Sequence, residues 1–346
     1  MAQNSGQTYE GEVVRIVATG QEEIMDEYVG YQELEIKLTN GDKKGETITI
    51  KNSESSMGLV TLDTQQYQPG DKLRLSFYPG AEGKQTWVIE GPIKRSGLIA
   101  LLLLFIIAVV GVGRLWGALS LVGLFTSFIV IFKLIIPLII RGVNPVFAAV
   151  LGSVIIVPIT FYISHGFNKK THVGVITTLI GLIFTGFMAI YFVNAAHLTG
   201  YASEEAGFLQ VERQGSIDIR GLLLAGIIIG TLGILDDVTI GQASTVEQLK
   251  KANKKMSMGE LFKNGMKVGQ DHISSMVNTL VLVYSGSALP LLLMFFGSEK
   301  TFLDIMEFEL IAEEIVRMLV GSIGLVLSAP LATIIAAYVF ENKSKQ

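Results

Sequence analysis

Two adjacent carboxylates, Asp236 and Asp237, lie inside an otherwise apolar stretch, GTLGILDDVTIGQAS at residues 230–244. A charged side chain at the centre of a membrane-spanning helix costs about 2.5–3.5 kcal/mol to insert, so it is seldom kept there without a task. Carboxylates coordinate cations and accept or release protons. The pair is therefore the first candidate for chemistry. The alternative interpretation is that both residues mark the cytoplasmic end of a helix.

The two aspartates face different neighbours, because adjacent residues on a helix project about 100° apart. Asp236 shares its face with Thr239, Gln242 and Ala243, which supply polar groups that a cavity needs. Asp237 lies on a stripe of small residues that allows a neighbouring helix to approach closely, made by Gly226, Gly230, Gly233 and Gly241. We expect Asp236 to contact a translocated ion and Asp237 to hold the helices together.

A second polar cluster stands at the inner end of the next apolar run: Asp271, His272, Ser274, Ser275, Asn278 and Thr279. Within it, Asp271, Ser275 and Asn278 share one helical face with Leu282. If this helix meets the aspartate pair at the same depth, the two clusters could coordinate a cation or relay a proton. The alternative is that Asp271 and His272 are interfacial and that Asn278 hydrogen-bonds to a neighbouring helix.

A third cluster, Glu313, Glu314 and Arg317, begins the last apolar run, and Glu313 and Arg317 have the spacing of an i, i+4 pair. The simplest interpretation is that these charges anchor the outer end of a helix. The functional alternative is an outer gate of a pathway whose inner site is the aspartate cluster. The residue types single out no cofactor and no particular metal.

The elements that must position these clusters are membrane helices. Half of the 346 residues are hydrophobic and only 17% are charged. Crossing about 30 Å of hydrocarbon takes roughly 20 apolar residues, and seven runs approach that length: 97–113, 117–140, 144–165, 172–196, 219–243, 273–296 and 316–340. We predict an α-helical polytopic membrane protein with about seven transmembrane helices in residues 96–346, in contact with the lipid bilayer.

Basic residues orient this bundle, since Lys and Arg near the ends of spans stay in the cytoplasm. Most of these basic residues follow the odd-numbered apolar runs: Arg114, Lys169, Lys170, Lys250, Lys251, Lys254, Lys255, Lys263, Lys267, Lys343 and Lys345. The C-terminus is therefore expected to be cytoplasmic and the N-terminal domain extracytoplasmic. Ser257 and Glu260 have capping-box spacing and predict a basic amphipathic helix on the inner surface before the sixth span.

Residues 1–95 are polar and alternate with period two, which predicts about five short strands with turns at NGDKKG, QPGD and PGAEGK. A small β-barrel of the OB type fits this pattern. The segment is acidic on balance, which favours a soluble accessory domain over an oligonucleotide-binding one. Such a domain does not easily cross a membrane ahead of its first span. Either that span acts as a late reverse signal or, as we favour, a further segment precedes the β domain.

Several function classes lack their signatures. The chain has no cysteine, which excludes disulfides and thiolate chemistry, and its net charge of −4 comes without the basic stripe of a nucleic-acid-binding protein. HExxH, GxSxG and P-loop motifs are missing from the sequence, which disfavours an enzyme and ATP-driven transport by this chain alone. An intramembrane aspartyl protease would need Asp236 or Asp237 with Asp271, and the flanking residues offer no support for it.

Three segments resemble the signature segments of the bacterial YibE/YibF family of multi-pass membrane proteins: GTLGILDDVTIGQAS, DHISSMVNTLVLVYSGSALPLLL and EEIVRMLVGSIGLVLSAPLAT. The resemblance covers most of residues 97–340. It implies an integral protein of the bacterial cell membrane with an extracytoplasmic β domain before the helices, and it implies topology rather than an activity. The chain departs from the family pattern in lacking a hydrophobic segment before the β domain.

Two hypotheses from different classes follow. The first is a permease or secondary transporter for an ion or small solute, with Asp236, Asp237, Asp271 and Asn278 lining its inner site. The second is an envelope receptor or assembly protein whose outer β domain binds a partner. The small-residue stripes also predict self-association or pairing with a related membrane protein.

Overall fold

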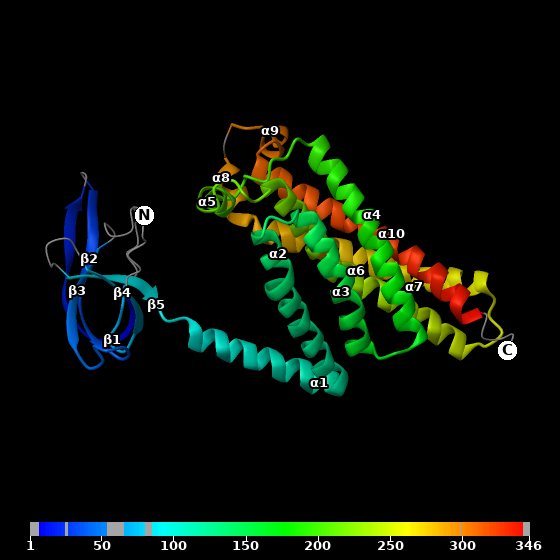
Figure 1. Ribbon diagram of the computed structural model, residues 1–346, viewed down its shortest axis with the longest axis horizontal. Helices are drawn as coiled ribbons and strands as arrows, with labels where there is room; N and C mark the ends of the chain where they lie inside the picture. The colour runs from blue at the N-terminus through cyan, green and yellow to red at the C-terminus, as the bar shows by residue number, and fades with distance from the viewer. Residues whose placement is uncertain (1–6, 25–26, 54–65, 80–84, 298, 342–346) are drawn as a thin grey trace. The chain divides into compact units, whose positions relative to one another are not determined.

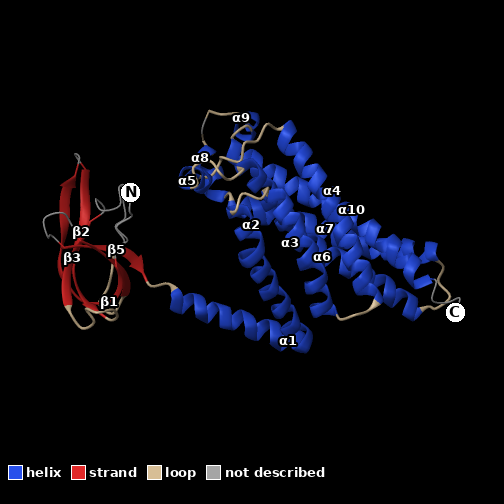
Figure 2. Cartoon of the chain, in the orientation of Figure 1, coloured by secondary structure: helices blue, strands red, loops and turns tan. Residues whose placement is uncertain are grey.

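The computed structural model describes residues 7–24, 27–53, 66–79, 85–297 and 299–341. The chain divides into two compact units, residues 1–107 and 108–346. Figure 2 shows that the strands all precede the helices along the chain and that helices make up the second unit. The predicted division into an N-terminal β part and a helical remainder agrees with this element order.

The first unit is built on one antiparallel sheet with the order β3-β2-β1-β4-β5. Its strands are β1 (Gln7–Ile24), β2 (Glu27–Leu38), β3 (Thr47–Ser53), β4 (Lys72–Pro79) and β5 (Gln85–Pro92). The edge strands β3 and β5 contact each other, so the sheet curls toward a barrel. The predicted turns NGDKKG and QPGD lie where expected, and most of PGAEGK lies outside the described residues.

Period-two alternation explains which side chains fill this sheet. Leu34, Ile36 and Leu38 on β2 face Leu73 and Leu75 on β4 in one cluster, and all five are almost completely buried. The prediction of about five strands is confirmed. However, β1 is a long strand of 18 residues rather than a short one, because it pairs with both β2 and β4.

The second unit is a helical bundle that begins within α1 (Arg95–Val130). A π-helical stretch (Ile131–Ile135) follows α1, and the other helices are α2 (Ile136–Ile140), α3 (Pro145–His165), α4 (Lys169–Ala195), α5 (Glu204–Glu212), α6 (Ile219–Ala252), α7 (Met258–Ser287), α8 (Leu289–Phe295), α9 (Phe302–Met306) and α10 (Glu309–Glu341). Five helical segments in the described part are long and apolar enough to cross a membrane, or six if α7 and α8, bent by 66°, form one broken span.

That number is lower than the seven expected spans because the first two apolar runs fall within one helical segment, Arg95–Ile140. The segment is not regular throughout. Arg114 has non-helical backbone angles, φ 51 and ψ −132, that mark a break in α1. The other predicted runs coincide with α3, α4, α6, α7 with α8, and α10.

Helix α6 is the centre of the bundle and packs against α3, α4, α7 and α10. Small and hydroxylated residues make the close contacts. Thr178 of α4 and Thr239 of α6 share a hydrogen bond of 2.7 Å, and both are completely buried. On α7, Gly265 lies against Val246 of α6 and Thr333 of α10. Such packing is typical of helices in a membrane, where van der Waals contact between closely approaching helices drives association because the hydrophobic effect does not.

Helix α7 differs from the surface helix that the sequence predicted. Its capping box is confirmed, because Ser257 and Glu260 exchange both hydrogen bonds. The predicted turn between an amphipathic surface helix and the sixth span is wrong, since α7 runs without interruption from Met258 to Ser287. The reason is that Gly265 and Gly269 let this segment lie along α6 and α10.

The turns of the helical unit gather at two opposite ends (Figure 1). One end holds the break at Arg114, the α3–α4 turn, the α6–α7 turn and the end of α10, and the other end holds the α2–α3 turn with α5, α8 and α9. The first end carries most of the basic residues that the sequence placed in the cytoplasm, including Lys169 and Lys170. Lys343 and Lys345 lie outside the described residues.

Candidate functional site

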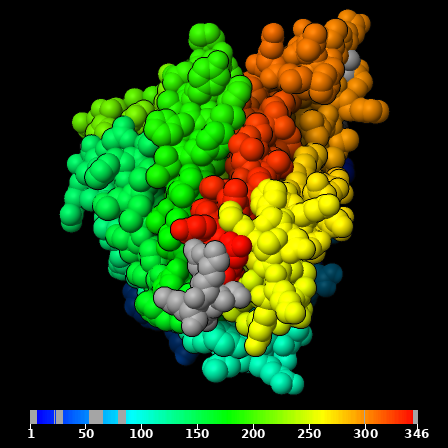
Figure 3. Space-filling model, turned by 90° about the vertical axis from the view of Figure 1, so that its right-hand side faces the viewer, coloured from blue at the N-terminus to red at the C-terminus, as the bar shows by residue number. Residues whose placement is uncertain are grey.

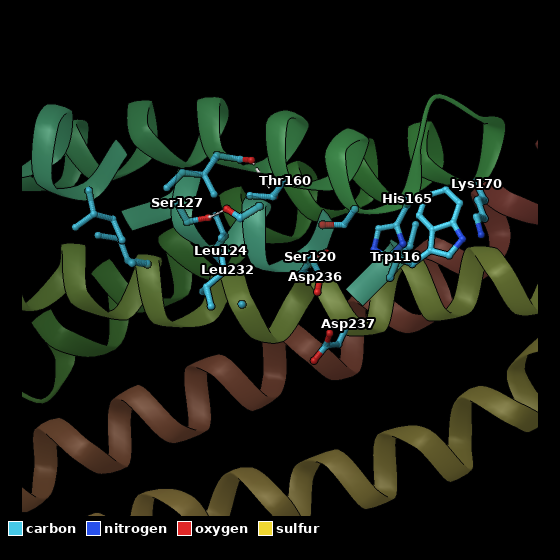
Figure 4. Close-up of a pocket in the computed structure, with 17 residues that line it drawn as sticks. Trp116, Ser120, Leu124, Ser127, Thr160, His165, Lys170, Leu232, Asp236 and Asp237 are labelled. Atoms are coloured by element: carbon cyan, nitrogen blue, oxygen red, sulfur yellow. Dashed lines mark hydrogen bonds between the residues drawn. The ribbon is translucent and has the colours of Figure 1, made fainter. Parts of the chain in front are cut away.

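A cavity of about 620 Å³ lies within the helical unit, between the second half of α1, α3, the start of α4 and α6. Its lining is mostly apolar, with Leu124, Ile131 and Leu232 among the apolar side chains. Figure 4 shows Trp116, His165 and Lys170 at one end, Ser127 and Thr160 toward the other, and the two aspartates between them. The cavity therefore brings carboxylates, hydroxyls and basic groups to one space.

Asp236 is the more buried of the two carboxylates that α6 contributes to the lining of this cavity. Leu235 and Val238 on either side are fully buried in the bundle, which fixes the rotation of the helix. Asp236 itself is half-buried, and its Oδ1 atom is buried without a hydrogen-bond partner among the residues that the structure describes. A buried polar atom left without a partner costs about 1–3 kcal/mol, so we expect a ligand or a water molecule to supply the missing bond.

Hydroxyl groups from two helices line the cavity beside the carboxylate. Ser120 Oγ donates to Gly117 O over 2.8 Å, and Thr160 Oγ1 donates to Ile156 O over 2.9 Å. Ser127 makes the equivalent bond within α1. Because each hydroxyl hydrogen is used by its own helix, the oxygen lone pairs remain available as acceptors. The lining near Asp236 consequently offers acceptor oxygens rather than donors.

Asp237 lines the same cavity but lies on the exposed face of α6. Gly226, Gly230 and Gly233 of the glycine stripe are exposed too, and a side chain added at any of them would meet nothing within 4 Å. The expectation that this stripe packs against a helix of this chain is wrong. The opposite face of α6 contacts the other helices of the bundle instead. Asp237 lies within electrostatic reach of His165 and His272.

Thr239 and Gln242 belong to the packed face rather than to the cavity. Thr239 is bonded to Thr178, and Gln242 accepts a hydrogen bond of 2.9 Å from Thr333 Oγ1. Gln242 also lies directly against Gly269 of α7. Both polar side chains thus join α6 to its neighbours.

The α7 cluster lies apart from the cavity lining. Asp271, His272, Ser275 and Asn278 are all exposed in this structure, and none of them lines the cavity. The face of α7 that packs on α6 and α10 is the apolar one, with Ile273, Met276, Val277 and Leu280. The structure therefore brings Asp236 and Asp237 together with residues of α1 and α3, and His272 of α7 lies within electrostatic reach of Asp237.

The charges at the start of α10 form a separate cluster. Arg317 forms an ion pair with Glu314 at 2.8 Å, whereas the i, i+4 spacing predicted that it would pair with Glu313. Glu313 is 8% exposed, and its Oε1 atom has no partner among the described residues. Glu309 accepts hydrogen bonds from the backbone of Thr199, at 2.6 Å, and of Gly200. This cluster ties the α4–α5 loop to α10.

The sequence did not single out the cavity partners of Asp236: Trp116, Ser120, Ser127, Thr160, Ser164, His165 and Lys170. A signal was present, because Ser120 and Ser127 repeat at seven residues and Thr160 and Ser164 at four, which places each pair on one helical face. In the described part of the chain, no three His, Asp or Glu side chains converge as a metal site.

Two family comparisons cover nearly the whole chain. Residues 101–342 match the family described as YibE/F-like protein, and residues 6–92 match the YibE/F family N-terminal domain. A search of curated proteins and a search of solved structures each gave no match.

Proposed function

The chain belongs to the YibE/F family, and from that premise we propose that it is a permease or secondary transporter for an ion or small solute in the bacterial cell membrane. The family and the apolar helices identify a membrane protein. The transport role rests on one observation. A cavity of about 620 Å³ within the helical unit contains the Asp236 carboxylate, whose buried Oδ1 atom has no partner in the described residues.

The cavity chemistry supports an ion or a proton-donating solute as the cargo. A carboxylate and hydroxyl lone pairs are the groups that replace the hydration shell of a cation, and a carboxylate is also the common proton carrier of transporters. Lys170 places a positive charge at one end of the cavity, beside the His165 imidazole. In this proposal Asp236 binds the cargo, Ser120, Thr160 and Ser164 complete its surroundings, and Asp237 lies where the cavity opens to the exposed face of α6.

The topology belongs to the same proposal. Arg95–Ile140 contains 46 residues, which as a helix would extend about 69 Å, twice the thickness of the hydrocarbon core. We infer that the break at Arg114 separates two spans, for about seven in all, and that the basic end of the bundle is cytoplasmic. The β domain is then extracytoplasmic, and its strand order with β3 beside β5 supports a partly open OB-type barrel. We further infer that transport proceeds without an enzymatic step.

A second candidate function is partner binding by the β domain. The observation that favours it is a group of exposed apolar side chains on β1, Val14, Ile16 and Val17, next to two irregularities in the pairing with β2. Exposed apolar groups on a sheet mark contact sites when they cluster. Photo-crosslinking from position 14 or 17 of the full chain in intact envelopes should then capture a partner, and capture of lipid alone would count against this candidate.

Flux measurements on proteoliposomes test the transport proposal. We would load vesicles with a pH-sensitive dye and challenge them with a panel of alkali-metal and divalent chlorides, with and without an imposed proton gradient. The wild-type chain is expected to carry at least one of these ions or protons. Asp236→Asn keeps the shape of the side chain but removes its charge. It should lower the flux by about 10- to 100-fold, the loss expected from one charge-assisted interaction.

Glu247→Gln provides the matched control. Glu247 lies on the same helix, pairs with Lys251 at 3.0 Å and does not line the cavity. The control should transport at the wild-type rate. Equal flux in wild type and Asp236→Asn, with both proteins folded and inserted, would contradict the proposal. The absence of flux for every ion in the panel and for protons would contradict an ion as the cargo.

A further inference from the structure

The outer face of α7 carries a row of three polar side chains and one leucine, and no hydrogen bond or ion pair joins these side chains to another element in the described part of the chain. Asp271, Ser275, Asn278 and Leu282 follow one another at steps of four, three and four residues, and all four are exposed. Ser274 and Thr279 flank the row and are exposed as well. Figure 3 shows α7, in yellow, at the edge of the bundle beside α10 in red. We call the row Asp271, Ser275, Asn278 and Leu282 the α7 polar face.

The polar face lies at membrane depth. Gly269 of α7 contacts Gln242 of α6, and Gly265 contacts Val246, so the two helices run antiparallel. Asn278 follows Gly269 by nine residues, about 13 Å along a helix. This places Asn278 level with Gly233 of α6, in the middle of the apolar run 219–243. An amide at that depth cannot form hydrogen bonds with lipid tails.

The α7 side chains do not find partners within their own bundle. Ile273, Met276 and Leu280 occupy the opposite side of α7 against α6 and α10. No side-chain hydrogen bond or ion pair involves Asp271, Ser274 or Asn278 within the ranges that the structure describes. Thr279 Oγ1 donates only to Ser275 O of its own helix, over 2.9 Å. The polar face therefore needs an external partner that can both donate and accept.

We propose that the α7 polar face is a self-association surface and that its partner is a second copy of this chain. Two copies inserted in the same direction are related by an axis along the membrane normal, so identical residues meet at identical depth. An amide facing an amide and a hydroxyl facing a hydroxyl are self-complementary, since each group donates and accepts.

One further feature fits this partner. Alternating steps of four and three residues are the spacing of a left-handed crossing between two helices. The proposal is independent of the transport role, because the α7 polar face does not line the cavity.

The absence of cysteine from the chain makes the test direct. Ser275→Cys and Asn278→Cys would be introduced singly and oxidised in native membranes. Both should form disulfide-linked dimers. Phe187→Cys is the control, because Phe187 is 70% exposed on α4, away from α7. It should remain monomeric. Cross-linking that is equal at all three positions, or absent at both α7 positions, would overturn the proposal, and so would an adduct with a different protein.

A second measurement does not depend on disulfide geometry. The dimer fraction in vesicles, counted by single-molecule photobleaching at several protein-to-lipid ratios, should fall for Asn278→Leu and be retained for Asn278→Gln. An interhelical hydrogen bond in a membrane corresponds to about a three- to tenfold change in the dissociation constant. A dimer fraction that is the same for the Leu variant and the wild type would contradict self-association through this face.

Discussion

The β unit (residues 1–107) and the helical unit (residues 108–346) differ in whether each buried polar side-chain atom has a hydrogen-bond partner among the described residues. In the β unit, Gln32 donates to Tyr67 O and accepts from Tyr67 N, so both ends of its amide are bonded. In the helical unit, Asp236, Glu313 and Arg317 each have a buried atom without a partner among the described residues. Every such atom in the part of the chain that is described belongs to the second unit.

This difference distinguishes buried polar groups that stabilise the fold from buried polar groups that are available to bind a ligand. A buried polar group whose hydrogen bonds are all made contributes to the stability of the fold. A buried polar group without a partner lowers that stability, so its presence needs another explanation, such as binding a ligand. The β unit is accordingly expected to lose stability when a buried polar residue is removed. The helical unit is expected to lose function at Asp236 and little stability at its other unbonded atoms.

The largest expected effect on stability is at Gln32. Gln32→Leu keeps the volume of the side chain but leaves the buried N–H and C=O of Tyr67 without partners, at a cost of about 2–4 kcal/mol for the two groups. Denaturant unfolding followed by the fluorescence of Trp87, in a Trp116→Phe background, would measure it. Gln21→Leu, at an exposed position of β1, is the control. An unchanged midpoint for Gln32→Leu would show that the bonded amide does not stabilise the β unit.

A smaller loss is expected where helices approach closely. A Cβ atom at Gly265 would lie 2.9 Å from Thr333 Cγ2 and 3.1 Å from Val246 Cγ2, and both neighbours are β-branched and cannot easily move. Gly265→Ala should cost about 1–3 kcal/mol, measured as loss of helical circular dichroism during titration with SDS. Gly226→Ala adds the same atom in open space and should cost nothing. Equal losses would mean that the α7 contact is not tightly packed.

A pH effect confined to the β unit should be smaller still, because Asp42 and Tyr9 form a single pair. Tyr9 OH donates to Asp42 Oδ1 over 2.6 Å, and this bond holds the pKa of Asp42 below 3.8 and raises the pKa of Tyr9 to about 12. The stabilisation by Asp42 is thus present above pH 3.8 and is lost as the pH falls through the lowered pKa. The stabilisation by Tyr9 is present below pH 10 and is lost toward pH 12.

Comparison with Tyr9→Phe checks that pH dependence. The variant should show a flatter stability curve at both extremes of pH, since it lacks the bonded hydroxyl. Unfolding midpoints of the β unit at pH 3, 7 and 10.5 would provide the measurement. Parallel curves for the variant and the wild type would show that the pair does not link stability to pH.

The smallest expected effect is at Ser328, whose Oγ atom is buried without a partner among the described residues. Ser328→Ala should leave stability unchanged or raise it by no more than about 0.5 kcal/mol, because no hydrogen bond is lost and an unbonded buried hydroxyl is removed. Ser153 is its matched control, since this equally buried serine donates to Ala149 O over 2.8 Å. Ser153→Ala should cost about 1 kcal/mol. A greater loss at Ser328 than at Ser153 would remove the distinction between bonded and unbonded groups.

Much of the fold could be predicted because local patterns determine it. Period-two alternation predicted the strands, and runs of about 20 apolar residues predicted most of the helices. The breaks were harder to place. The continuity of α7 depends on Gly265 and Gly269 finding neighbours on two other helices, and a sequence does not show which helices those are.

The candidate site was predicted in part for the same reason. Asp236 and Asp237 were identified because charge is rare in apolar runs. Their neighbours were not, because Ser120, Thr160 and His165 lie far from the aspartates in sequence and meet them only through the packing of α1, α3 and α6. Helical periodicity placed Asp236 with Thr239 and Gln242, but the rotation of α6 in the bundle decides which of these faces the cavity.

Accessibility of the cavity to water is the most direct test of the central claim, which is that Asp236 lines a cavity that binds a transported ion or solute. The chain has no cysteine, so Ser120→Cys would report on the cavity alone when intact vesicles are exposed to a charged thiol reagent. Rapid modification is predicted at Ser120→Cys, and slow modification at Thr178→Cys, which is buried, and at Phe187→Cys, which is exposed on α4 outside the cavity. Modification of Ser120→Cys no faster than that of either control would contradict the account.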